Sequence, residues 1–314
     1  MELRHLRCFL AVAEELHFAR AAERLHIEQS PLSRAIKELE EELGVVLFAR
    51  TTRSTRLTRA GKLFLDHVPR VFAALQQARD SVKAAANGFH GQLRIALSDG
   101  ITPSRLPALL ALCRQEEPEV EIRFFEVPLS QQIKGLNDDL YDVGFARADE
   151  VGDGIVALPV WNDPMMVAVP ARHPLLAHKR IPLEELLRYP LVLCDPQACE
   201  GHARQVDRVL HRVDMEPLVV ERVASCDLMM ALVSAGFALG LTGASHIAAS
   251  QEQGVVARSL VGRSPMLTTY LLRLDGDPSE TLARFIERVQ AIESPEVARP
   301  TSGHCPDPPE EPKS

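Results

Sequence analysis

Polar and basic side chains are concentrated in one short stretch near the start of the chain. The stretch offers hydrogen-bonding and cationic groups: Gln29, Ser30, Ser33, Arg34 and Lys37. Arginine and lysine bind phosphate oxygens, and glutamine, serine and arginine also form hydrogen bonds with the edges of bases. If a helix presents them together, these side chains suit double-stranded DNA.

Apolar periodicity predicts helices that would present this stretch. Apolar residues recur at spacings of three and four in three segments, residues 3–13, 18–25 and 32–43. Ser30 is a favourable N-cap and Pro31 suits the first helical position, so we expect the third helix to begin there and to end at Gly44. Two helices joined by a short turn, with polar side chains at the start of the second, are typical of a helix-turn-helix that enters the major groove.

A basic hairpin is expected directly after the third helix. Residues 45–48 and 55–58 are strand-like and flank a polar tip. Arg50, Arg53 and Arg56 lie in this segment, and no acidic residue lies among them. Such a wing is suited to contacts with phosphates or the minor groove. The first domain is therefore predicted to be an all-α winged helix-turn-helix.

These residues carry a resemblance to a known family. Ser30-Pro31-Leu32-Ser33, the Leu-Gly-x-x-Leu-Phe-x-Arg pattern of residues 43–50 and the segment 57–61 together resemble the N-terminal signature of LysR-type transcriptional regulators. The resemblance implies a regulator that binds promoter DNA. It also implies the residues that contact DNA: Gln29, Ser30, Pro31, Ser33, Arg34, Lys37, Arg50, Arg53 and Arg56.

The distribution of charge agrees with a DNA-binding segment at one end. The whole chain of 314 residues has a formal net charge of −8. Residues 1–90 contain 14 basic and 11 acidic side chains and are net positive, so the acidic excess lies entirely in the remainder. Only the first segment therefore has the charge that favours a polyanion.

Composition excludes several other classes of protein. Hydrophobic residues make up 46% and charged residues 25%, as in ordinary globular proteins, and no apolar run approaches the about 20 residues of a membrane span. The first residues do not resemble a signal peptide, so we expect a cytoplasmic protein. Six cysteines without a C-x-x-C pair predict neither a metal site nor a disulfide framework. Motifs for catalysis or cofactor binding are also lacking, which favours a non-enzyme without a cofactor.

A long helix is predicted to connect this domain to the rest of the chain. Apolar residues from Phe64 to Ala85 alternate spacings of four and three, which is the seam of a coiled coil. An exposed helix of this kind gains stability by pairing with its copy in a second subunit. The resemblance implies the same linker, usually within a homotetramer. Pro69 lies inside this helix and predicts a kink.

Alternating strands and helices follow from about residue 91 and predict an α/β domain with a largely parallel sheet. The resemblance implies two lobes around a cleft, as in periplasmic binding proteins. The expected boundaries are 1–58 for the DNA-binding domain, 59–90 for the linker helix, 91–294 for the effector domain (lobe I 91–162 and 267–294, lobe II 163–266) and 295–314 for a disordered tail.

Ligands of such sheets bind beyond the carboxyl ends of the strands, near helix N-termini. The predicted effector residues are Ser98, Asp99, Leu129, Ser130, Arg147, Gly201 and His202. Arg147 is the expected carboxylate partner, because its planar guanidinium binds both oxygens. Ser98 matches the position of a hydroxyl in relatives that sense aromatic and muconate-type acids, whereas Leu129 replaces a residue that is often polar in them. The expected effector is a small organic acid or aromatic compound.

Two alternatives to a regulator that senses a small organic effector are a redox-sensing regulator and a transport protein. A redox-sensing regulator would use Cys194, Cys199 or Cys226 of the second lobe. A transport protein that only carries its ligand is disfavoured by the helix-turn-helix. The expected partners are promoter DNA, a small-molecule effector and further copies of the chain, with RNA polymerase as a candidate and no membrane.

Overall fold

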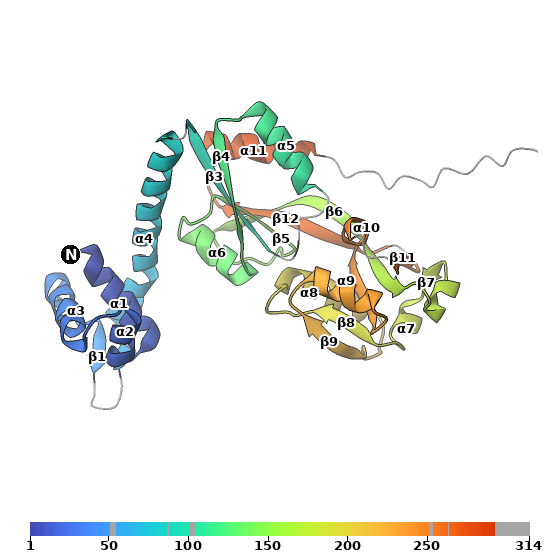
Figure 1. Ribbon diagram of the computed structural model, residues 1–314, viewed down its shortest axis with the longest axis horizontal. Coiled ribbons are helices and arrows are strands. Elements are labelled where there is room, and N and C mark those ends of the chain that lie inside the picture. Colours follow the sequence, from blue (N-terminus) through green and yellow to red (C-terminus); the bar gives the residue numbers. More distant parts are fainter. Residues whose placement is uncertain are drawn as a thin grey trace, which may run out of the picture.

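A computed structural model describes residues 1–50, 55–86, 88–98, 100, 105–250, 254–262 and 264–292 (Figure 1). The predictions for Arg53, Asp99 and the segment 295–314 lie outside these residues, as does the one for the side chain of Arg50.

The N-terminal domain packs three helices around a small hydrophobic core. Its elements are α1 (Leu3–Glu15), α2 (Phe18–Arg24), α3 (Gln29–Leu43), β1 (Phe48–Arg50) and β2 (Thr55–Leu57). The rings of Phe9 and Phe48 pack with centroids 5.4 Å apart, so α1 is joined to the hairpin. The two strands are antiparallel, with Phe48 opposite Leu57. The predicted helix-turn-helix and wing are thus present.

Helix α3 begins two residues earlier than the sequence predicts. Glu28 has an extended backbone and is the N-cap, so Ser30 and Pro31 lie in the first turn. Proline is tolerated there because its missing N–H would have had no partner within the helix. Gly44 ends the helix in the left-handed conformation (φ 68°), as predicted.

Helix α4 (Arg59–Ala86) connects the two parts of the molecule and continues without a break through Pro69. The Thr58 hydroxyl accepts a hydrogen bond from the N–H of Gly61 at 3.0 Å. A Cβ atom at Gly61 would lie 2.2 Å from the carbonyl oxygen of Leu47, so only glycine permits this close packing of α4 on the first domain. Farther along, Val71 and Val82 are 43% and 71% exposed, which leaves part of the predicted seam open.

The C-terminal region is an α/β domain with two lobes (Figure 1). The first lobe contains β3 (Gly91–Leu97), α5 (Leu106–Glu116), β4 (Val120–Glu126), α6 (Leu129–Asn137), β5 (Val143–Ala146) and α11 (Glu280–Ala291). The second contains η1 (Pro174–Ala177), β7 (Arg180–Ile181), α7 (Leu183–Leu186), β8 (Leu191–Cys194), α8 (Glu200–Leu210), β9 (Val219–Val223), α9 (Cys226–Ser234), β10 (Leu239–Gly243), α10 (Ala244–Ala249) and β11 (Val255–Leu260).

Two long strands pass between the lobes, β6 (Ile155–Pro170) and β12 (Met266–Leu274). They pair antiparallel, from Met266 opposite Pro164 to Leu274 opposite Ile155. The strand order is β4-β3-β5-β12-β6-β10-β8-β9, with β11 also on β6 and β7 on β11. Within each lobe the other main strands are parallel: β3 with β4 and β5, and β8 with β9 and β10.

Each lobe has its own core. In the first, Phe145 stacks on Trp161 with centroids 5.0 Å apart, and the Trp161 indole donates to the carbonyl oxygen of Val289 at 3.3 Å. In the second, the core of β6, β8 and β10 is aliphatic and includes Met165, Leu191 and Leu241. Among the described residues, no helix has the length and apolarity needed to cross a membrane.

Candidate functional site

The start of α3 presents the predicted DNA-binding side chains on its outer face. Gln29, Ser30, Pro31, Arg34 and Lys37 are exposed, and Ser33 is half-buried. On the opposite face, Leu32, Ala35, Ile36 and Leu39 are buried in the core. On the wing, Arg56 of β2 is exposed as well. The structure therefore brings together on one domain those predicted DNA-binding residues whose side chains it describes.

The acidic residues of α3 are largely neutralised or turned away from this face. The Glu40 carboxylate accepts hydrogen bonds from the backbone N–H groups of Leu47 and Phe48, at 2.7 and 3.0 Å, and so ties α3 to the wing. Glu41 forms an exposed ion pair with Lys37 at 3.4 Å. In the part of the chain that the structure describes, Arg34 forms no ion pair, so its guanidinium is available to a phosphate or a base.

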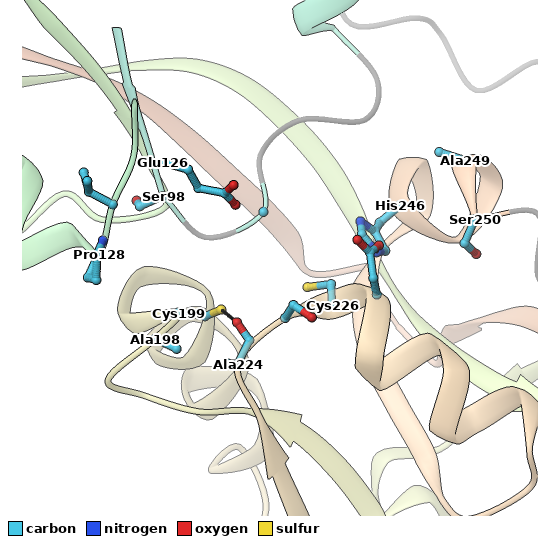
Figure 2. A pocket seen from close by; sticks show the side chains of 14 residues that line it. Ser98, Glu126, Pro128, Ala198, Cys199, Ala224, Cys226, His246, Ala249 and Ser250 are labelled. Carbon is cyan, nitrogen blue, oxygen red and sulfur yellow. Dashed lines mark hydrogen bonds and ion pairs between the residues drawn. The ribbon is translucent and has the colours of Figure 1, made fainter. Parts of the chain in front are cut away.

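A cavity of about 480 Å³ lies between the two lobes (Figure 2). The first lobe contributes Ser98, Gly100, Glu126, Val127 and Pro128, and the second contributes Ala198, Cys199, Ala224, Ser225, Cys226, Asp227, His246, Ala249 and Ser250. In the first lobe, the residues at positions 98 and 100 follow β3. The residue at position 126 ends β4, and those at positions 127 and 128 follow it. The second-lobe residues include the starts of α8 and α9, which follow β8 and β9. The cavity thus lies at the carboxyl ends of parallel strands, where the sequence predicts a ligand.

Of the predicted effector residues that the structure describes, Ser98 lines this cavity. Its hydroxyl donates to the carbonyl oxygen of Phe145 at 3.4 Å. Leu129 is buried in the first lobe, whereas Ser130 is exposed outside the cavity. Gly201 is buried in α8. The structure therefore does not bring this predicted set together in one place.

Arg147 lies behind the cavity and joins the lobes. Its side chain is 5% exposed, and Nη1 lies 2.5 Å from Nδ1 of His202 in α8. The Gln205 side-chain amide donates to the carbonyl oxygens of Arg147 and Thr268, at 2.6 and 2.8 Å. These bonds connect the residue that follows β5 with the second lobe and with β12.

The surroundings of His202 keep its imidazole neutral. Burial, together with the positive charge of Arg147, lowers the pKa of His202 to about 3. Its Nε2 lies 3.2 Å from the carbonyl oxygen of Leu241, to which it donates, so Nδ1 accepts from Arg147. His202 is therefore an acceptor for the guanidinium rather than a second cation.

Other charged groups of the cavity were not predicted from the sequence. Nε2 of His246 lies 3.1 Å from the Asp227 carboxylate, and burial lowers the pKa of His246. Glu126 is exposed at the other wall. Ser225, which caps α9 by accepting from the N–H of Leu228, also lines the cavity. The only sequence signal for these residues is their position at strand ends and helix starts.

The second lobe contains three buried cysteines at or near this cavity: Cys199 and Cys226 line it, and Cys194 contacts Cys226. Sγ of Cys194 and Sγ of Cys226 are 3.6 Å apart, and the Cys199 thiol donates to the carbonyl oxygen of Ala224 at 3.3 Å. Hydrogen bonding from Cys194 and the charge of Arg147 lower the pKa of Cys226 to about 7. Hydrogen bonding and burial raise the pKa of Cys194.

A winged helix-turn-helix joined by a long helix to a two-lobed domain with a ligand cavity defines a ligand-responsive DNA-binding regulator. Family comparison agrees with this class. Residues 3–62 match the bacterial regulatory helix-turn-helix protein, lysR family, and residues 86–292 match the LysR substrate binding domain. The chain belongs to the LysR family of DNA-binding transcriptional regulators. The predicted class, fold and absence of enzyme function are thereby confirmed.

Relatives of this chain include other transcriptional regulators and solved structures. It is 35% identical to the uncharacterized HTH-type transcriptional regulator YnfL of Escherichia coli, over 78% of this chain and 83% of the relative. It is 32% identical to the regulator BenM of Acinetobacter baylyi, over 78% and 81%. The crystal structure of full-length CbnR with its target DNA is similar with a TM-score of 0.70 and 29% identity, over 93% of this chain and 99% of that one.

Proposed function

We propose that α3 enters the major groove of promoter DNA and that the interlobe cavity binds a small organic effector. The single observation that carries the second part is the position of the cavity, at the carboxyl ends of β3, β4, β8 and β9. Its volume falls within the range of about 300–1,000 Å³ typical of small-molecule sites.

The groups around the cavity support a particular class of effector. The N-terminus of α9 presents backbone N–H groups that favour a carboxylate. Glu126 and Asp227 disfavour a second negative charge and suit a hydrogen-bond donor of the ligand. We therefore propose a monocarboxylate or an aromatic compound with one hydroxyl or amine group.

Binding of the effector would change the arrangement of the two lobes relative to each other. Ligand contacts with both walls favour one lobe arrangement over another, and the equilibrium shifts by the difference in affinity. The open stripe of α4, with Val71 and Val82, supports pairing of this helix with α4 of a second subunit. We infer a homotetramer in which the lobe arrangement sets the spacing of the DNA-binding domains and hence the bend of the promoter. RNA polymerase is a candidate partner on the same promoter in the cytoplasm.

A thermal-shift screen of small acids against the full-length protein tests the cavity. A true effector raises the Tm of the wild type by mass action. The shift should shrink in Ser98→Ala, which alters the cavity wall, and persist in Ser130→Ala, which changes an exposed serine outside it. Each shift is measured against the ligand-free Tm of the same variant. Equal shifts in both variants would place the ligand elsewhere.

A further inference from the structure

The cysteines behind the cavity form a cluster that the proposed effector does not use. Cys194 ends β8, Cys199 precedes α8 and Cys226 begins α9, so three separate elements bring the thiols together. Their spacing in the sequence is irregular, and for this reason no metal motif is visible there. The fold creates a site that the sequence pattern does not show.

The tightest part of the cluster consists of two sulfurs and an imidazole. Ligand atoms of Cys194, Cys226 and His202 all lie within 4.8 Å of one another. Both nitrogens of His202 are already engaged, with Arg147 and with the carbonyl oxygen of Leu241. The donors that remain for a ligand at this point are the two sulfurs.

Access and charge also favour a bound cation of low charge. Cys199 and Cys226 line the interlobe cavity, so a small ion can reach the cluster from there (Figure 2). Arg147 carries a positive charge near Cys226 and favours its thiolate. The hydroxyl of Thr242 donates to Sγ of Cys226 at 3.8 Å and orients that sulfur. These features distinguish the cluster from cysteines that only fill hydrophobic space.

We propose that Cys194 and Cys226 bind a soft monovalent cation of the Cu(I) type at this wall of the cavity. Thiolates are the ligands that such soft ions prefer. Each S–H bond breaks, its proton passes to water, and each thiolate donates an electron pair to the ion, so no electron is transferred. The resulting pair of thiolates with one monovalent ion has a net charge of −1, which the guanidinium of Arg147 compensates.

Binding of one ion requires the two sulfurs to move apart. Two donors alone hold an ion in a nearly linear arrangement, in which sulfurs with metal–sulfur bonds of about 2.3 Å lie about 4.6 Å apart. The sulfurs of Cys194 and Cys226 are 3.6 Å apart and must therefore separate by about 1 Å when the ion binds. A structural zinc ion usually has four protein ligands, and the engaged imidazole of His202 makes that set incomplete.

Competition for Cu(I) tests the site. Reduced full-length protein is titrated anaerobically against the chromophoric chelator bicinchoninate. We expect one retained ion per chain in the wild type and in Cys113→Ser, a buried cysteine of the first lobe. Cys194→Ser and Cys226→Ser should lose it, and Thr242→Val should weaken retention about tenfold. Retention by both cysteine variants, or a wild type that retains Zn²⁺ but not Cu(I), overturns the proposal.

A second measurement needs no variant. Bound Cu(I) should slow alkylation of Cys226 by iodoacetamide in the wild-type protein, as followed by peptide mass spectrometry. Unchanged alkylation contradicts the site. If Cu(I) gives no protection and a peroxide converts Cys194 and Cys226 to a disulfide, the two cysteines are a redox pair and the metal proposal fails.

Discussion

Nη1 of Arg147 lies 2.5 Å from Nδ1 of His202, and this contact joins the end of β5 in the first lobe with α8 in the second. Both side chains are buried, so the hydrogen bond is formed away from competing water. It is a direct polar link between the lobes, next to the cavity that we assign to the effector.

Replacing His202 by leucine should destabilise the C-terminal domain. The change removes an acceptor from a buried guanidinium, which costs about 2 kcal/mol. His202→Gln keeps an acceptor at this position and should recover most of the loss. Urea unfolding followed by near-UV circular dichroism measures both variants. If leucine and glutamine give the same stability, the bond to Arg147 contributes little.

Arg34→Ala should weaken binding to promoter DNA by about 1–3 kcal/mol, because α3 then loses a phosphate or base contact. Fluorescence anisotropy with a labelled promoter duplex measures the change. Arg188→Ala is the matched control, since it removes an equal charge from an exposed position of the second lobe. Similar losses in the two variants would indicate a general charge effect instead of a contact from α3.

Val82→Glu should dissociate the dimer that we propose α4 forms. The valine is 71% exposed in one chain, and a pair of helices would bring two glutamates into an apolar seam. Lys83→Glu changes the adjacent exposed residue and introduces the same side chain outside the predicted seam. Sedimentation equilibrium should show smaller assemblies for the first variant alone. An unchanged mass for Val82→Glu would rule out this seam as the interface.

Glu117 should make the first lobe sensitive to acid. Its carboxylate bonds to Arg288 and Arg284, which hold its pKa below the usual value and link α5 to α11. Because the folded-state pKa is depressed, this stabilisation is complete above the unfolded pKa of about 4.3 and is lost as the pH falls through the folded value. Glu117→Gln should therefore lower stability by about 2 kcal/mol at neutral pH and flatten the acid dependence. Thermal unfolding of the wild type and of Glu117→Gln is measured at pH 7 and below pH 4. If the Tm of both proteins falls by the same amount, the carboxylate of Glu117 does not cause the sensitivity to acid.

Much of the fold follows from local sequence patterns. The three helices of the first domain have clear apolar periodicity, and their predicted positions agree closely with the structure. Strand β10 has no clear local pattern because Leu239–Gly243 is short and contains two glycines. The first half of β6 has none because prolines at positions 159 and 164 interrupt the strand. The strand is stabilised by its pairing with β12, which is distant in the sequence, so local sequence patterns cannot predict it.

The site was predicted less completely than the fold. Ser98 lines the cavity as expected, because it follows directly from a recognisable strand. His246 and Asp227 come together only when α10 and α9 pack side by side, which depends on the order of strands in the sheet. The contact between Cys194 and Cys226 spans 32 positions and likewise depends on that order. Local sequence patterns carry no information about contacts between residues that are far apart in the sequence.

The most direct test of the account is a titration of the purified protein with its own upstream DNA at two salt concentrations, with an unrelated duplex as control. The account predicts tight binding that weakens as salt rises, because α3 and the wing displace counterions from phosphates, while the preference for the upstream duplex persists. Equal affinity for both duplexes at each salt concentration would contradict sequence-specific binding by this domain.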